Sequence, residues 1–239
     1  MSGHSHWAGI KHRKGINDKK RGKIFTKFGK IITIAARDGG GGKPETNFKL
    51  KLAIDQARYV NMPKENIERA IKRGTGELKG DVIEEVVYEA YGPGQVAMLI
   101  KTATDKKNRT LGELKLILDE AGGKLVPAGS VGFLFRQMGI ISVAVAEGAD
   151  PYDLEMKAIE AGAEDTIYTD NTLTVYTKSE ELQKVKEALD KVGLIIQDAG
   201  LGFVPLQKHS ITQDEKLDYE KLLEALDDQD DVQEIYDNL

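Results

Sequence analysis

The chain has 239 residues, of which 40% are hydrophobic and 31% are charged, a composition typical of a folded protein with two or three domains. It contains no cysteine, which excludes disulfide bonds, thiolate metal sites and cysteine nucleophiles and fits a reducing, cytoplasmic location. No run approaches eighteen consecutive apolar residues and no apolar segment follows the basic start, so we expect neither a membrane span nor a secretory signal.

The net charge of −5 conceals an uneven distribution of charge along the sequence. Residues 1–80 hold 19 basic and 7 acidic residues, a balance of +12, whereas the remainder holds 15 basic and 32 acidic residues, a balance of −17. A cationic segment is attracted to polyanions, and an anionic segment is repelled by them. The first third of the chain is therefore the part that we expect to bind a polyanion.

Residues 1–17 show no helical or strand periodicity and are rich in Gly, His and Lys, so we expect a mobile basic arm. Three helices are predicted next, over 18–37, 46–60 and 63–73. The signals are apolar residues at three- and four-residue spacing, a proline in a first helical turn, and glycines as stops. Short connections between them predict a three-helix bundle, and we expect this helical domain over 18–78.

After the bundle the pattern changes to mixed strand and helix. The β-rich runs over 82–92 and 95–104 flank a Gly-Pro-Gly sequence, which indicates a hairpin. A helix is predicted over 106–121, and residues 131–136 are a further strand candidate.

Residues 139–205 then give the order strand–helix–strand–strand–helix–strand, which is the ferredoxin-like order. The two helices are predicted over 150–163 and 180–193, and two strands meet at the turn Asp170-Asn171. We therefore expect a separate ferredoxin-like domain over 138–205.

The tail from about Thr212 returns to a helical pattern that we extend to the C-terminus. Its apolar side indicates that it packs on the middle domain, formed by 79–137 plus 206–239, and the ferredoxin-like domain is then an insertion. The predicted fold class is α+β, with an N-terminal three-helix bundle and two α+β domains, one ferredoxin-like and inserted in the other. The apolar side consists of Leu217, Leu222, Leu223 and Leu226.

Three of the four histidines stand in the opening segment GHSHWAGIKHRKG. If Met1 is removed, the new Ser-Gly-His start has the donor set of a square-planar Cu(II) or Ni(II) complex. A mobile arm, however, supplies no groups to orient such ligands, and residues 1–17 contain no carboxylate. We therefore expect no physiological metal site at His4, His6 and His12, and no cofactor.

The sequence lacks the common motifs of catalysis. It has no Gly-x-Ser-x-Gly elbow, no His-Glu-x-x-His and no phosphate loop that ends in Gly-Lys-Ser/Thr. The four glycines at 39–42 follow a predicted helix rather than a strand, and we interpret them as a flexible connector. We expect no catalytic residues and a non-enzymatic protein.

Nucleic-acid binding is the function that the residues favour. Several cations that act together bind a polyanion and release its counterions, and aromatic rings of a flexible arm stack on unpaired bases. Residues 1–30 hold nine Lys and Arg against one acid. The expected nucleic-acid contacts are His6, Trp7, Lys11, His12, Arg13, Lys14, Lys19, Lys20, Arg21, Lys23, Lys27 and Lys30.

A second basic cluster is predicted at the start of the helix over 106–121. Free backbone N–H groups and the helix dipole favour anions at such a position. The cluster is either a secondary contact for phosphate or a basic turn between hairpin and helix, and the sequence leaves both interpretations open. Its residues are Lys106, Lys107, Asn108 and Arg109.

The opening segment and the following DKKRGKIFTKFGKIITIAAR resemble the N-terminus of the YebC family. The segments NMPKENIERAIKRGTGEL, YEAYGPGQVAMLIKTATDKKNRT, GGKLVPAGSVGFLF and LDDQDDVQEIYDNL resemble further motifs of that family in the same order. The resemblance implies three domains, the ferredoxin-like one inserted in the middle one. The chain differs from the usual family pattern at His6, Gly9 and Phe48, where Lys, Asn and Pro are common.

Members of this family are commonly described as cytoplasmic DNA-binding transcriptional regulators. Mitochondrial relatives are described as translational activators, and bacterial relatives have been linked to ribosomes. The resemblance therefore implies a nucleic-acid-binding regulator of gene expression, with an RNA- or ribosome-bound translation factor as the alternative. No predicted helix shows an Arg, Asn or Gln face for direct base readout. A basic arm with Gly, His and one Trp, joined to acidic α+β domains, suits an RNA crevice, so the residues favour RNA whereas the family's description favours DNA.

Overall fold

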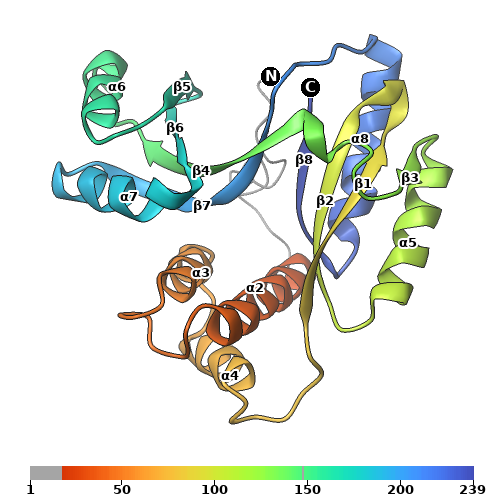
Figure 1. The fold of residues 1–239 in the computed structure, drawn as a ribbon, viewed down its shortest axis with the longest axis horizontal. Helices are drawn as coiled ribbons and strands as arrows, with labels where there is room; N and C mark the ends of the chain where they lie inside the picture. The colour runs from red at the N-terminus through yellow and green to blue at the C-terminus, as the bar shows by residue number, and fades with distance from the viewer. Residues whose placement is uncertain (1–17, 147) are drawn as a thin grey trace. The chain divides into compact units, whose positions relative to one another are not determined.

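The computed structural model describes residues 18–146 and 148–239, with side chains from residue 21 onward (Figure 1). The chain forms two compact units, one that ends at Arg136 and resumes over Phe203–Leu239, and a second over Gln137–Gly202. The first contains a helical bundle and an α+β domain, and the second has the ferredoxin-like fold. The predicted α+β class, with a bundle and an inserted ferredoxin-like fold, is confirmed.

The bundle consists of α2 (Asp18–Asp38), α3 (Phe48–Tyr59) and α4 (Lys64–Gly74) (Figure 1). Each helix turns one apolar face toward the other two, as the three- and four-residue spacing of its apolar side chains requires. The buried cluster at their centre is formed by Phe28, Ile32, Ala35, Ala36, Leu50, Ala53, Ile54, Ala57, Met62, Ile67 and Ala70.

Asn47 ties the end of α2 to the start of α3. Its buried side chain caps α3 by accepting a hydrogen bond from the N–H of Leu50 (3.0 Å), and its amide donates to the carbonyls of Ala35 (2.8 Å) and Gly41 (2.8 Å). The glycines at 39–42, which we expected to form a flexible connector, thus form a turn held by hydrogen bonds. Two of them have φ near +100°, a conformation that glycine adopts without strain.

The middle domain is built on a four-stranded antiparallel sheet of order β3-β1-β2-β8. The hairpin predicted around Gly-Pro-Gly is confirmed, with β1 (Glu84–Tyr91) and β2 (Ala97–Thr104) joined through the 3-10 turn η1 (Pro93–Gln95). The outer strands are β3 (Lys124–Val126), paired with β1, and β8 (Val232–Asp237), paired with β2.

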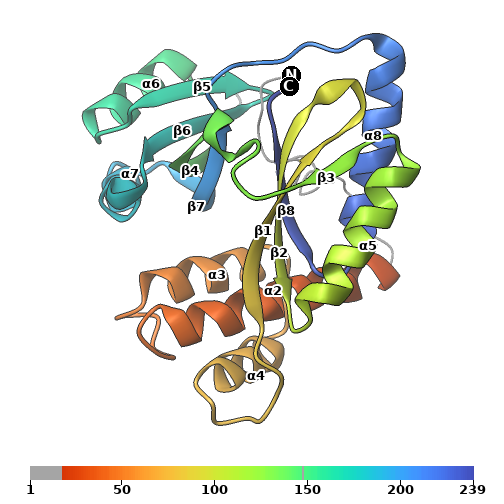
Figure 2. The same cartoon turned by 45° about the vertical axis from the view of Figure 1, so that its right-hand side comes forward.

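Two helices, α5 (Lys107–Glu120) and α8 (Gln213–Asp228), lie side by side on one face of this sheet (Figure 2). Their apolar sides and the inward residues of the strands exclude water between the two layers, which is the main favourable contribution to folding. The core between the layers consists of Ala90, Val96, Met98, Ile100, Leu114, Leu118, Tyr219, Leu222, Leu223, Leu226, Val232 and Ile235.

The C-terminal segment differs from its prediction as a continuous helix. α8 ends at Asp228, and residues Val232–Asp237 form the strand β8. This strand pairs with the central strand β2, with Ile235 opposite Ile100. Val232 and Tyr236 are buried in this strand. A strand partner about 130 residues earlier in the chain decides this conformation, and periodicity within the segment carries no information about it.

The strand candidate at 131–136 is also only partly correct, because residues Gly132–Leu134 form a 3-10 turn (η2). The carboxylate of Glu89 fixes this loop: burial would raise its pKa, but backbone hydrogen bonds outweigh burial and lower it. The donors, at 2.6–2.9 Å, are the N–H groups of Gly129, Val131 and Gly132.

The ferredoxin-like fold has the strand order β5-β6-β4-β7, with β6 antiparallel to both β4 and β5. The turn between β5 and β6 is Asp170-Asn171, as expected, and both residues have positive φ. Its elements are β4 (Phe135–Ala144), α6 (Pro151–Glu160), β5 (Asp165–Thr169), β6 (Thr172–Lys178), η3 (Ser179–Glu181), α7 (Leu182–Lys191) and β7 (Ile195–Pro205).

No helix over residues 18–146 and 148–239 is both long and apolar enough to cross a membrane.

Asn47→Ala is expected to lower the free energy of unfolding by about 2–3 kcal/mol, because it removes a helix cap and the amide that donates to the carbonyls of Ala35 and Gly41. Urea denaturation followed by circular dichroism measures this change. The matched control is Thr46→Ala at the neighbouring exposed position, where we expect less than about 0.5 kcal/mol. Similar losses for the two variants would contradict the role given to the Asn47 amide.

Candidate nucleic-acid interface

Most of the nucleic-acid contacts predicted from the sequence belong to the N-terminal segment. Lys19 and Lys20 lie in the first turn of α2, and the first described side chain, that of Arg21, is exposed. The metal candidates His4, His6 and His12 lie outside the described residues, and in the described part of the chain no three His, Asp or Glu residues form a cluster suited to a metal ion. Also outside the described residues are the predicted contacts His6, Trp7, Lys11, His12, Arg13 and Lys14.

The other predicted contacts of α2, Lys23, Lys27 and Lys30, form a lysine face that lies against the end of α8. The ammonium group of Lys23 donates to the backbone carbonyl and to a carboxylate oxygen of Asp228, both at 2.9 Å. Lys27 donates in the same way to the carbonyl (2.7 Å) and the carboxylate (3.3 Å) of Asp227.

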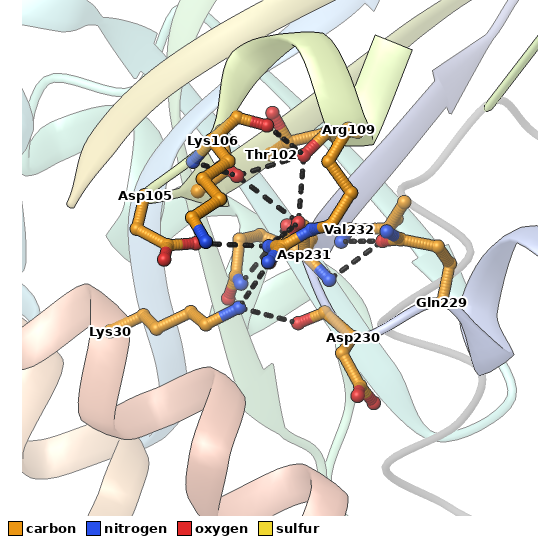
Figure 3. A network of polar contacts seen from close by, with 12 residues as sticks. Lys30, Thr102, Asp105, Lys106, Arg109, Gln229, Asp230, Asp231 and Val232 are labelled. Carbon is orange, nitrogen blue, oxygen red and sulfur yellow. Dashed lines mark hydrogen bonds and ion pairs between the residues drawn. The ribbon is translucent and has the colours of Figure 1, made fainter. Parts of the chain in front are cut away.

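Lys30 continues this arrangement one turn further along α2 (Figure 3). Its ammonium group donates to the carbonyl of Asp230 (2.9 Å) and to the carboxylate of Asp231 (2.5 Å). The partners of the lysine face thus all lie within residues 227–231, which we term the acidic loop.

The lysine face satisfies a helix end that has no cation of its own. The last carbonyls of a helix lack partners within the helix and carry the negative end of its dipole. The last turn of α8 contains no basic residue and ends in Asp227 and Asp228, whose charges add to that of the dipole. Lys23 and Lys27 supply donors to the last two carbonyls of α8, and all three ammonium groups supply compensating charge.

Asp231 is the centre of this network, and its side chain is only 3% exposed (Figure 3). One carboxylate oxygen binds Lys30, and the other accepts from Arg109 (2.7 Å), Thr110 (2.7 Å) and Thr104 (3.1 Å). Burial would raise the pKa of Asp231, but the hydrogen bonds from Lys30, Arg109 and Thr110 outweigh burial and hold it well below its usual range. This carboxylate is therefore charged throughout the physiological pH range.

The second predicted basic cluster lies at the start of α5, where its cations face carboxylates of the same chain. Arg109 binds Asp105 (2.9 Å) as well as Asp231, and Lys107 pairs with Glu84. The anion expected at this helix start is thus supplied by Asp231 itself.

The remaining members of that cluster, Lys106 and Asn108, have exposed side chains. The N–H of Lys106 donates to Thr104 (3.0 Å), which fixes the turn that leads into α5. Of the two interpretations of the cluster, the turn between hairpin and helix is the one that these contacts describe.

Lys27 is buried against the acidic loop in this arrangement, so its side chain is not accessible to a nucleic acid. Its side chain is 4% exposed, and burial lowers its pKa despite the attraction of Asp227. The lysine face was predicted as a row of phosphate contacts; here it is an internal contact with the acidic loop.

Sequence reasoning did not select the cations that the bundle exposes elsewhere. They lie on α3 and α4, where single lysines and arginines alternate with acids and give no run that stands out in the sequence. The exposed cations of these two helices are Lys49, Lys51, Arg58, Lys64, Arg69, Lys72 and Arg73.

Asp231→Asn is expected to lower the free energy of unfolding at pH 7 by about 2–3 kcal/mol, because Lys30 and Arg109 lose the charge that balances them. The pKa of Asp231 is lower in the folded than in the unfolded state. The carboxylate therefore adds to the free energy of unfolding above about pH 4, and this stabilisation is lost as the pH falls toward the pKa of the folded state. Urea denaturation between about pH 7 and pH 2.5 should therefore show a steeper loss for the wild type than for the variant.

The control for this experiment is Asp218→Asn, which removes the exposed ion pair with Lys221 on α8. An exposed pair contributes little, so we expect a change of less than about 0.5 kcal/mol and a pH dependence like that of the wild type. A pH dependence of Asp231→Asn that matches the wild type would refute the central role of this carboxylate.

Comparison with known proteins covers the whole of this architecture. Residues 5–77 match the TACO1/YebC protein N-terminal domain, and residues 83–239 match the TACO1/YebC second and third domain. A probable transcriptional regulatory protein of Caldanaerobacter subterraneus is 47% identical over 239 residues, with 100% of this chain and 98% of the relative covered. Another of the same description, from Persephonella marina, is 49% identical over 243 residues, with 100% and 95% covered.

A solved structure agrees with these sequence relatives. The crystal structure of a conserved hypothetical protein from Aquifex aeolicus superposes with a TM-score of 0.90 at 44% identity and covers 98% of this chain and 96% of its own. Two adjoining domain models and full-length relatives thus describe the same three-part chain. The protein belongs to the TACO1/YebC family.

Proposed function

We propose that the protein is a non-enzymatic, cytoplasmic regulator of transcription that binds DNA through its N-terminal segment. The observation that carries this proposal is its end-to-end similarity to relatives that bear the name probable transcriptional regulatory protein. The charge balance of +12 over residues 1–80 supports it, because a segment so rich in cations attracts polyanions.

The proposed contact segment is residues 6–21, which precedes the lysine face of α2. Its cations neutralise phosphates, which provides affinity that does not depend on base sequence. The ring of Trp7 and the imidazoles stack on exposed bases or lie along a groove. The contacts proposed are His6, Trp7, Lys11, His12, Arg13, Lys14, Lys19, Lys20 and Arg21.

The acidic remainder of the chain limits how much of the protein approaches the polyanion. With a balance of −17 after residue 80, the two α+β domains are repelled by phosphate, so binding concentrates on the cationic first third. Such a division leaves the α+β domains accessible while the N-terminal segment is bound.

The perturbed ionisable groups of the described chain support a non-enzymatic role. A catalytic group needs a shifted pKa together with access to a substrate. Burial raises the pKa of Tyr219, but its hydroxyl donates to Asp237 (2.9 Å) within the packed middle domain. Asp231 is likewise held in a structural network.

The triple variant Lys11→Ala/Arg13→Ala/Lys14→Ala tests the contact segment. We expect it to fold normally and to weaken binding of a labelled DNA duplex at least about tenfold at 100 mM salt, with the slope of log K against log salt reduced by about 2–3, because about three phosphate contacts are lost. Fluorescence anisotropy measures both quantities.

A matched control removes three exposed lysines of the ferredoxin-like fold, Lys178, Lys184 and Lys191, and changes the net charge equally. We expect it to reduce affinity less than threefold. Equal losses in the two triple variants would overturn the assignment of the contact segment.

The kind of nucleic acid is tested by crosslinking in cells followed by sequencing of what is bound. Enriched DNA loci are expected for a transcriptional regulator. Recovery of ribosomal RNA without enriched DNA loci would overturn this part of the proposal and support a translation factor instead.

A further inference from the structure

The aspartates that contact the lysine face become steadily more buried along α2. At the pair Lys23–Asp228 the side chains are 41% and 72% exposed, and at Lys27–Asp227 they are 4% and 32% exposed. At the far end, the side chain of Asp231 is 3% exposed against Lys30. The end nearest the proposed contact segment is therefore the one most open to solvent.

The two parts joined by this contact have separate apolar cores. The buried cluster of the bundle and that between the middle sheet and its helices share no residue. The contacts described between α2 and the acidic loop are hydrogen bonds and ion pairs. The pair Lys23–Asp228 is exposed, so it contributes little to stability, is screened by salt and can be replaced by another anion.

A phosphate group offers the lysine face the same chemistry as the acidic loop, namely negatively charged oxygens that accept hydrogen bonds from ammonium groups. Lys23 is the residue of the lysine face nearest in sequence to residues 6–21, so a polyanion bound there and continuing along α2 meets Lys23 first and then Lys27. The aspartates that it would replace there are Asp228 and Asp227.

We propose that the acidic loop is an internal competitor of nucleic acid for the lysine face of α2. This inference rests on the proposed nucleic-acid binding and concerns how that binding is regulated. A bound polyanion displaces Asp228 and Asp227 from Lys23 and Lys27, and the bundle is released from the end of α8. The deeper contact of Lys30 with Asp231 limits how far the exchange proceeds.

This competition couples two equilibria. Nucleic-acid binding and the internal contact weaken each other by the same factor, so whatever weakens the internal contact strengthens nucleic-acid binding. In the wild type the two lysines exchange carboxylates for phosphates, so they contribute less to the salt dependence of binding than lysines that face solvent.

The test is the double variant Asp227→Asn/Asp228→Asn in the full-length protein, which retains the carbonyls and the Asp231 network. Relative to the control below, we expect its dissociation constant for a labelled DNA duplex to fall about 3- to 10-fold, because the variant removes the exposed ion pair at Lys23 and the partly buried ion pair at Lys27. We also expect the slope of log K against log salt to steepen by about 1–2. Circular dichroism verifies that the variant is folded.

The control is Glu220→Gln/Glu224→Gln, two exposed acids of α8 that change the net charge by the same amount. This variant measures the general effect of removing two negative charges near the bundle. Equal gains in affinity for the two double variants would mean that long-range repulsion, and not competition, is responsible.

A distance measurement gives a second, independent readout. Because the chain has no cysteine, Asp55→Cys in α3 and Glu120→Cys in α5 give one unique pair of exposed labelling sites for fluorescence energy transfer. We expect saturating duplex to change the transfer efficiency, and Asp227→Asn/Asp228→Asn to shift it in the same direction without DNA.

The outcomes separate this inference from the proposed function. Binding by the wild type, with equal affinities for the two double variants and a constant transfer efficiency, overturns the competition and leaves the proposed function intact. If the wild type binds neither DNA duplex nor single-stranded RNA at 50 mM salt, the proposed function itself fails.

Discussion

The carboxylate of Asp231 is the interaction on which the first compact unit depends. It receives Lys30 from the bundle, Thr104 from the end of β2, and Thr110 and Arg109 from α5. Its own carbonyl accepts from the N–H of Ala103 (2.8 Å), which places the start of β8 beside β2. A buried charge is stable only when its donors are all in place, so this one residue makes the bundle, the hairpin and the last strand interdependent.

Much of the fold follows from local patterns in the sequence. The bundle helices have strong three- and four-residue periodicity, and Leu50 and Ala57, which lie on the apolar face of α3, are fully buried. The strand β8 was missed because its pairing partner β2 lies about 130 residues away, and the preceding leucine spacing of α8 appeared to continue. Contacts of such high sequence separation leave no periodic trace in the segment itself.

The lysine face shows a different limit of sequence reasoning. The spacing of Lys23, Lys27 and Lys30 places the three side chains on one side of a helix, because that depends only on helical geometry. Whether such a face binds a polyanion or a carboxylate of its own chain depends on what folds against it. The run of aspartates at 227–231 was the available signal, since its charge complements that of the lysine face, but no local rule pairs segments 200 residues apart.

The position of the acidic loop near the end of the chain also orders events during synthesis. The bundle is complete in sequence by residue 78, whereas residues 227–231 are added about 150 residues later, which at 5–20 residues per second is about 8–30 s. Throughout that interval the nascent chain carries the lysine face without its aspartates. A newly made bundle therefore acquires its internal counter-charge only after residues 227–231 have been synthesised.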